Sequence, residues 1–224
     1  MKVLVAVAVG LGLLVTQDLP HAFPREGATS IVDNARVSMW DVTWFKGKPS
    51  PMHRHRYDLV GVYLVGSAIK VTGLDGNASE SRVDPGFVLF QPKGVTHIEE
   101  GMDEKNPRHA ILVDLKETTV APIANTSGHP TAFPREGAKK VLENDRVVIW
   151  DYRWTLGKPT PMHFHDKDVF VVYMDEGELK STTPDGRSEI TKVTVGLARY
   201  NPRNRVHSEE LVKGAARAII TELK

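Results

Sequence analysis

The sequence contains no cysteine among its 224 residues. This absence excludes disulfide bonds, thiolate metal sites and a cysteine nucleophile, so any metal ion must bind to nitrogen and oxygen ligands. An excess of one charge is also missing, because 29 Lys and Arg residues stand against 28 Asp and Glu residues. No block of five or more basic residues occurs. We therefore expect no nucleic-acid partner.

An apolar run long enough to cross a membrane is lacking as well. Lys2 is followed by 13 apolar residues, at positions 3–15, and then by a polar segment. A spanning helix needs about 20 apolar residues, whereas a charged start and a short apolar core are typical of a secretory signal peptide. We predict a signal peptide at residues 1–17, an exported (periplasmic or secreted) protein and no stable membrane insertion. If the run is instead a strand of the fold, the protein is cytoplasmic.

The chain repeats itself at an offset of 110 positions. Residues 22–28 (AFPREGA) recur at 132–138, and the offset also relates two pairs of tryptophans, Trp40 and Trp44 to Trp150 and Trp154. Such self-similarity indicates one structural unit used twice. The members of each tryptophan pair lie at even spacing and thus on one face of a strand, where we expect them to pack in a core.

Each repeat consists of short segments rich in Val, Ile, Tyr and Trp, separated by turn signals, and neither carries a helical period. Residues 74–77 (LDGN) and 184–187 (PDGR) are typical of hairpin turns. The predicted fold class is all-β, with two similar barrels or sandwiches at residues 20–116 and 130–224. The polar, Pro- and Gly-containing residues 117–129 are the predicted linker.

Histidines recur in register within these repeats. Two His-x-His motifs are 110 positions apart, and each is followed by a third histidine. Since side chains alternate along a strand, both histidines of each motif share a face, and the third can come from a neighbouring strand. The predicted metal ligands are His53, His55, His97, His163, His165 and His207. Neutral imidazoles suit Fe, Mn, Zn, Ni or Cu, and the spacing does not choose among these divalent ions.

These motifs resemble the two sequence motifs of the cupin superfamily. Gly47 precedes His53-Arg-His55 by six positions and Gly66 closes the first motif, while residues 86–97 (GFVLFQPKGVTH) match the second. The second repeat matches at residues 157–177 and 196–207, with Asn204 in place of glycine, and Asn tolerates positive φ. The chain is thus similar to a bicupin. This resemblance implies two tandem barrels of the double-stranded β-helix, or jelly-roll, type.

One departure from the cupin pattern affects the chemistry. The glutamate ligand of the family falls on Leu59 or Val60 in the first repeat and on Val169 or Phe170 in the second, and none of these can bind metal. The resemblance therefore implies three-histidine sites, similar to those of cysteine-type, diketone and gentisate dioxygenases. It argues against an oxalate decarboxylase or oxidase, which depends on the glutamate. Three neutral ligands leave coordination positions open to substrate and to O2 or water.

Carboxylates near the histidines are the candidates for further roles. Glu99 and Glu209 follow the third histidines by two positions, which places them on the same face as a possible base or fourth ligand. Asp58 and Asp168 lie at odd spacing from the His-x-His motifs. We expect them to cap a turn or to support the ligands from behind, rather than to bind metal.

The repeated motif also contains Arg25 and Arg135. Either could hold an anion, but a salt bridge with the adjacent Glu26 or Glu136 is the more ordinary interpretation.

The leading functional prediction is a three-histidine, Fe(II)-type dioxygenase or related redox enzyme acting on a small molecule. One alternative is a non-catalytic cupin that binds metal or a small ligand. Another is a Zn- or Mn-dependent lyase, isomerase or hydrolase, which needs Glu99 or Glu209 as its base. The substrate is beyond the sequence because fold does not fix function. A homo-oligomer also remains open, although two barrels in one chain already supply the pairing of single-cupin proteins.

Overall fold

The computed structural model describes residues 18–116, 120–121 and 123–224. These residues form 18 strands and no helix, which confirms the all-β fold class. The predicted signal peptide lies outside the described residues, and the predicted linker lies partly outside them. Among the described residues, no helix is long and apolar enough to cross a membrane.

Nine strands form the first barrel. They are β1 (Ala28–Asp33), β2 (Val37–Trp44), β3 (His53–Arg54), β4 (Asp58–Val65), β5 (Ala68–Gly73), β6 (Ala78–Arg82), β7 (Val88–Gln91), β8 (Thr96–Gly101) and β9 (Arg108–Leu115). A five-stranded sheet, in the order β1-β2-β9-β4-β7, faces a four-stranded sheet, in the order β3-β8-β5-β6. All of these pairings are antiparallel.

The second barrel repeats this arrangement. Its strands are β10 (Lys139–Glu143), β11 (Val147–Trp154), β12 (His163–His165), β13 (Val169–Tyr173), β14 (Gly177–Thr182), β15 (Ser188–Val193), β16 (Ala198–Asn201), β17 (Arg205–Gly214) and β18 (Ala216–Leu223). The sheet orders β10-β11-β18-β13-β16 and β12-β17-β14-β15 match those of the first barrel strand for strand. The repeat in the sequence is therefore one structural unit used twice.

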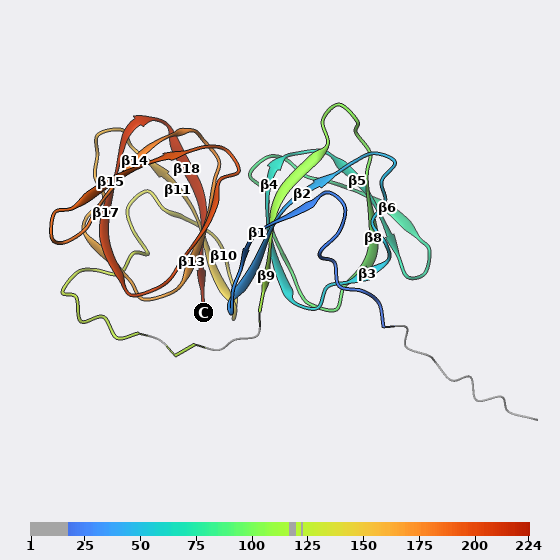
Figure 1. Ribbon diagram of the computed structural model, residues 1–224, viewed down its shortest axis with the longest axis horizontal. Helices are drawn as coiled ribbons and strands as arrows, with labels where there is room; N and C mark the ends of the chain where they lie inside the picture. Colours follow the sequence, from blue (N-terminus) through green and yellow to red (C-terminus); the bar gives the residue numbers. More distant parts are fainter. Residues whose placement is uncertain (1–17, 117–119, 122) are drawn as a thin grey trace, which may run out of the picture.

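The two barrels stand side by side and pack through their five-stranded sheets (Figure 1). In β4, Leu59 and Tyr63 point into the first barrel, while Val60, Val62 and Leu64 point out into a core cluster shared by both barrels. Since side chains alternate along a strand, a strand between two cores must be apolar on both faces. This requirement explains the nearly unbroken apolar run of β4.

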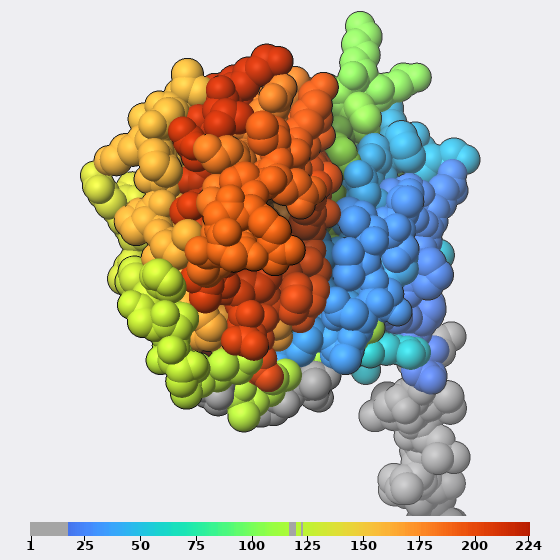
Figure 2. Space-filling view, turned by 60° about the vertical axis from the view of Figure 1, so that its left-hand side comes forward, coloured from blue at the N-terminus to red at the C-terminus, as the bar shows by residue number. Residues whose placement is uncertain are grey.

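The second barrel supplies the other half of this shared core. From β13, Phe170 and Val172 project outward into it, and Ile149 joins them from β11. Each side chain of this size contributes about 1.5–3 kcal/mol when fully buried. On the face displayed in Figure 2, the blue surface of the first barrel and the orange and red surface of the second meet without a gap. The barrels thus form one packed body.

Candidate metal centres

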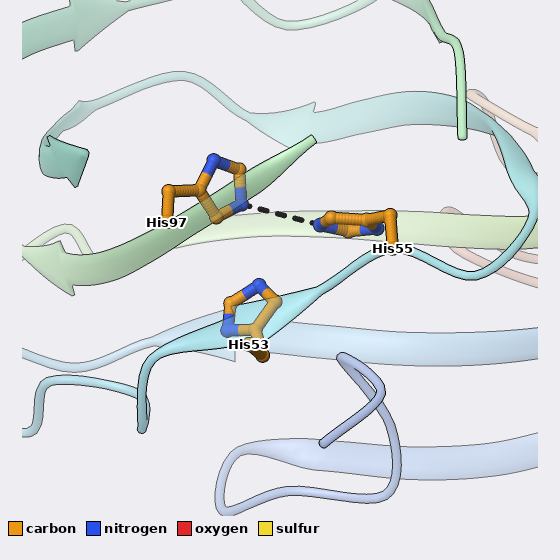
Figure 3. A group of neighbouring side chains, drawn as sticks. All are labelled: His53, His55 and His97. Atoms are coloured by element: carbon orange, nitrogen blue, oxygen red, sulfur yellow. Dashed lines mark hydrogen bonds between the residues drawn. The ribbon is translucent and has the colours of Figure 1, made fainter. Parts of the chain in front are cut away.

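In the first barrel, the structure brings His53, His55 and His97 together. His53 lies in β3, His55 follows directly after it, and His97 pairs with His53 across to β8. One ring nitrogen of each histidine lies within 4.8 Å of those of the other two. Figure 3 shows the three imidazoles turned toward one another, with Nε2 of His55 3.2 Å from Nε2 of His97.

The second barrel reproduces this triad with His163, His165 and His207 from β12 and β17. The ring centroids of its three pairs are 5.1, 4.8 and 5.1 Å apart, the same values as in the first triad. Nε2 of His165 lies 3.0 Å from Nε2 of His207. Two nitrogens bound at right angles to one ion, with bonds of about 2.1 Å, lie about 3.0 Å apart. Both triads therefore have the spacing of a metal site.

Hydrogen bonds fix which ring nitrogen is free to bind an ion. Nδ1 of His53 lies 2.9 Å from the carbonyl oxygen of Pro51, and Nδ1 of His163 lies 2.8 Å from that of Pro161. A carbonyl oxygen only accepts, so each Nδ1 carries the proton and each Nε2 keeps its lone pair. Nε2 of His53 is buried and has no hydrogen-bond partner among the described residues. This unpartnered nitrogen, pointing into the triad, fits a bound metal ion.

Burial also keeps the six histidines uncharged. It lowers the pKa of His53 and His207 to about 4 and that of His55 to about 3, because desolvation disfavours the imidazolium form. The pKa values of the other three are lowered for the same reason, and Arg205 adds to the effect at His165. At neutral pH all six are therefore in the form that binds metal.

Glu99 lies beside the first triad, on the side that its spacing predicts. Its Oε1 is 3.7 Å from Nε2 of His97, while Oε2 is 2.7 Å from Nη2 of Arg25 and accepts a hydrogen bond from Nε1 of Trp44 at 3.1 Å. Burial raises the pKa of Glu99, but the positive charge of Arg25, with His97 and the Trp44 hydrogen bond, outweighs it and brings the pKa to about 2. The carboxylate is ionised and neutralised by Arg25.

Glu209 has the equivalent place in the second barrel and accepts a hydrogen bond from Nη2 of Arg135 at 3.2 Å. Nη1 of the same arginine is 3.5 Å from Nε2 of His163. Burial raises the pKa of Glu209, but Arg135, together with His207 and His163, outweighs it, so that the net shift is downward. The roles of Glu99 and Glu209 as base or fourth ligand stay predictions.

These contacts correct the interpretation of the two arginines. Arg25 and Arg135 were expected to pair with their neighbours in sequence, Glu26 and Glu136, but they pair with the glutamates beside the triads. The neighbouring glutamates bind Lys48 and Lys158 at the surface instead, at 3.3 Å in both barrels. The reason is burial: a guanidinium inside the barrel requires a buried carboxylate as its counterion.

Asp58 caps a turn, as expected, and does more. Its Oδ1 accepts a hydrogen bond from the backbone N–H of Lys93 at 2.9 Å, and its Oδ2 lies 2.5 Å from Nη1 of Arg146 in the other barrel. Asp168 accepts from the backbone N–H of Arg203 at 2.9 Å, and its Oδ2 lies 3.6 Å from Nε of Arg36. Both aspartates thus link the barrels and do not bind in the triads.

Asn204 replaces a glycine of the motif without loss of the turn. Its φ is 64°, against 94° for Gly94 at the equivalent position. The backbone N–H of Asn204 donates to the carbonyl oxygen of His165 at 2.8 Å, as that of Gly94 does to His55. The second turn therefore positions its histidine as well as the first.

The two triads differ in the space around them. In the second barrel, His165 and His207 line a cavity of about 220 Å³, together with Tyr173, Arg199 and Arg205. Neither Arg199 nor Arg205 is among the site residues predicted from the sequence. The repeat does show that these positions differ between the barrels, because Leu89 and Val95 stand there in the first barrel.

Arg108 fills the corresponding space in the first barrel. It is 1% exposed, its guanidinium donates to the carbonyl oxygens of Ser67 and Ser81, and it lies over the ring of Tyr63 at 5.3 Å. Thr191 and Tyr173, the equivalents of Ser81 and Tyr63, line the cavity of the second barrel. There the small Ala216 begins β18 where Arg108 begins β9.

A second difference lies on the outer side of the arginine–glutamate pairs. Arg135 and His163 line another cavity, of about 360 Å³, which Thr155 also borders. The equivalent cavity beside Arg25 measures about 10 Å³ and is bordered by Phe45, the counterpart of Thr155. Two cavities therefore border the second triad, one at His163 and the other at His165 and His207.

Comparison with known proteins bears on the fold. No family model and no curated protein matches the chain. Among solved structures, a cupin 2 conserved barrel domain protein from Leptotrichia buccalis has a TM-score of 0.56 at 15% identity, covering 88% of each chain. AerE from Microcystis aeruginosa has a TM-score of 0.59 at 11% identity, covering 92% of this chain and 98% of that one. An oxalate decarboxylase from Bacillus subtilis has a TM-score of 0.57 at 11% identity, covering 87% and 74%.

At such identities the likeness shows the fold alone. The chain has the cupin fold twice, which confirms the bicupin resemblance, and each barrel carries a triad of histidines that could hold a metal ion. The three-histidine character also agrees with the structure, because the aspartates that follow the His-x-His motifs point to the partner barrel.

Proposed function

We propose that this protein is a metal-dependent enzyme whose second barrel transforms a small molecule by Fe(II)-type dioxygenase or related redox chemistry. The observation that carries the proposal is the cavity of about 220 Å³ that His165 and His207 line. It gives a small molecule direct access to the metal ligands, whereas Arg108 fills the equivalent space in the first barrel.

The ligand set favours redox chemistry. His163, His165 and His207 would hold the ion through Nε2, and Nδ1 of His207 lies 3.0 Å from Oγ of Ser181, which orients that ring. A divalent ion bound by three neutral ligands supplies Lewis acidity and open coordination positions for a small molecule and O2.

The state of Glu209 argues against the hydrolase and lyase alternatives. Such enzymes require a base of suitable pKa near the substrate. Glu209 is engaged by Arg135, and its pKa is lowered, so it is a weak base. A redox enzyme that uses the metal as its reactive centre does not depend on this carboxylate.

The first barrel supports a second role, that of a non-catalytic metal site. Its triad has the same geometry, but Arg108 and Tyr63 occupy the space through which a substrate would reach it. A metal ion held there would tie β3 to β8 and stabilise the fold by mass action. We propose that both barrels bind metal and that only the second one turns over substrate.

Metal content and oxygen consumption test this proposal. Protein purified without a histidine tag and without added metal is analysed for metal per chain, then depleted and reloaded separately with Fe(II), Mn(II) or Zn(II). Manganese is included because the Bacillus subtilis oxalate decarboxylase has Mn(II) centres. Each form is mixed with a panel of small carboxylic acids and phenols while O2 uptake is followed.

The expected result is about two metal equivalents per chain and O2 uptake with iron only. Turnover without O2, in the zinc or manganese form, would support the non-redox alternative instead. A wild-type protein that contains no metal and takes none up on reloading contradicts the enzyme proposal as a whole. The matched control is the same panel with metal but without protein.

A further inference from the structure

We infer that the substrate of the second barrel is a small anion, and that Arg199 and Arg205 bind its negatively charged group next to the metal ion. This inference rests on the proposed function, because it assumes a divalent ion at the second triad. It adds the chemical class of the substrate and two residues that select it.

The charged side chains that line the cavity are not balanced. Six charged side chains other than histidine line it: Arg135, Lys180, Glu189, Arg199, Arg205 and Glu209. Arg135 is neutralised by Glu209, and Lys180 is paired with Glu210 at 2.9 Å. Two arginines and Glu189 remain, so the cavity is positive before a divalent ion adds two further charges.

Among the described residues, neither Arg199 nor Arg205 forms an ion pair with a carboxylate. Nε of Arg205 donates to the carbonyl oxygen of Pro202 at 2.8 Å, and the carboxylate that attracts its charge, Glu209, already forms an ion pair with Arg135. The side chain of Arg199, which is exposed, makes no hydrogen bond or ion pair in the described part of the chain. An anion within reach of both guanidinium groups would stabilise their charges.

Strand register places both side chains on the cavity side of their strands. Arg205 is the cross-strand partner of His165, and partners directly opposite each other have Cβ atoms about 4.5–5.5 Å apart on one face of the sheet. Arg199 pairs with Val171, whose side chain belongs to the core inside the second barrel. Both side chains therefore line the cavity, Arg205 next to His165 and Arg199 at an exposed part of the wall.

The first barrel is the internal control. Leu89 and Val95 stand at the positions of Arg199 and Arg205, and β7 and β8 have the same register as β16 and β17. The histidines and the arginine–glutamate pairs are the same in both barrels. The anion site is thus an addition that distinguishes the second barrel, and no requirement of the fold explains it.

The cavity also limits the size of the anion. Its volume of about 220 Å³ lies below the roughly 300 Å³ at which pockets for drug-sized ligands begin. The planar guanidinium group matches a carboxylate in bidentate geometry. We therefore assign the site to a carboxylic acid of a few carbon atoms, which could bind the arginines with its carboxylate while another group reaches the ion.

Because Arg199 and Arg205 line the cavity at the second triad, metal binding and anion binding should be coupled. Like charges repel, so Arg205 weakens metal binding in the absence of an anion, and an anion relieves that repulsion. Metal and anion should each increase the affinity of the other by the same factor. A purely structural arginine does not produce this reciprocity.

The test uses the Co(II)-loaded protein, whose visible spectrum reports ligands at the metal. Succinate, benzoate and inorganic phosphate are the anionic probes, and succinamide is the uncharged counterpart of succinate. The key variant carries the residues of the first barrel, Arg199→Leu and Arg205→Val. Arg187→Leu with Lys213→Leu is the control, because it removes the same charge from the exposed surface.

We expect at least one of the three anions to change the spectrum of the wild type and of the control, and succinamide to have no effect. In the key variant the affinity for that anion should fall at least 10-fold, while Co(II) binding without anions becomes a few-fold tighter. Anion affinity that is unchanged in a variant with a normal circular dichroism spectrum would overturn the inference. A wild type that responds to none of the anions would do so too.

Two precautions keep the outcomes distinct. If the key variant does not fold, Arg199→Gln with Arg205→Gln removes the charges while keeping polar side chains of similar length, and the same loss of anion affinity is required of it. Failure of the wild type to bind Co(II) at the second triad contradicts the proposed function. Normal Co(II) binding with an unaltered anion affinity in the variants contradicts the anion site alone.

Discussion

The two barrels have the same metal triads and different surroundings. Ring centroids within each triad are spaced identically, and an arginine–glutamate pair accompanies each one. The lining differs, because Arg108 fills the first barrel where Ala216 leaves space in the second. The two repeats therefore share their metal ligands, while substitutions in the cavity wall leave the first site enclosed and the second accessible.

Removal of one triad at a time should have the largest effect. His163→Ala with His165→Ala is expected to lower the metal content by about one equivalent per chain and to abolish turnover, since the ligands of the accessible site are lost. His53→Ala with His55→Ala should lower the metal content equally and keep most of the turnover rate. Elemental analysis and O2 uptake measure the two effects. Equal loss of activity in both variants would show that the barrels are functionally equivalent.

Acid should destabilise the metal-free protein through both triads alike. The pKa of His53 in the folded protein is about 4, below the value of about 6.5 in the unfolded chain. Between these values the unfolded chain binds more protons, so the free energy of unfolding falls as the pH drops from 6.5 toward 4. The effect of His53 alone is on the order of 3 kcal/mol. Urea unfolding at several pH values measures it.

The two double-histidine variants separate the contributions of the two triads to this pH dependence. Because burial is the main cause of the lowered pKa values in both barrels, either variant should reduce the pH dependence by a similar amount. A pH dependence that survives in full in both variants would place its origin outside the triads. Metal-loaded protein should resist acid further, since the bound ion also competes with protons for the histidines.

Arg108→Ala tests whether this one side chain blocks access to the first triad. The substitution leaves the carbonyl oxygens of Ser67 and Ser81 without their charged donor and creates a void, so we expect a loss of about 2–4 kcal/mol in the free energy of unfolding. It should also let small probes reach the first metal ion, measured as a change in the Co(II) spectrum. In Ala216→Gly, the matched control, the first site should stay closed.

Much of the site could be predicted because the sequence motifs that indicate it are local. The His-x-His motifs place two ligands on one strand face, and the positions of His97 and His207 follow from a motif that includes its own turn. The strands and the barrel repeat follow from the same local patterns of apolar residues and turns. The fold was therefore expected in outline before any contact was known.

What the sequence did not reveal depends on contacts between distant segments. The pairing of Arg25 with Glu99 joins β8 to a loop far earlier in the chain, and nothing near Arg25 indicates it. The role of Arg108 was hidden by a change of register: Leu115 and Leu223, which pair with Val37 and Val147, lie 108 positions apart, not 110. A repeat aligned at one fixed offset sets Arg108 against the wrong residue.

The smallest predicted effect concerns how the two third histidines are oriented. Oγ of Ser181 lies 3.0 Å from Nδ1 of His207, whereas the equivalent residue beside His97 is Val71, which cannot form a hydrogen bond. Loss of such a partner typically lowers metal affinity about 10- to 100-fold. We expect Ser181→Val to act near the lower end of this range, since strand pairing still holds His207.

The reciprocal exchange, Val71→Ser, should strengthen metal binding at His97 by a smaller factor, because the new hydroxyl must compete with the apolar packing of β5. Competition with a chelator gives the affinity of each site when the other triad has been removed. If Ser181→Val leaves the second site unchanged, the hydroxyl is only a neighbour of the imidazole. The difference between the barrels then lies wholly in the cavity wall, and the positions of Arg199, Arg205 and Ala216 carry the specialisation of the second site.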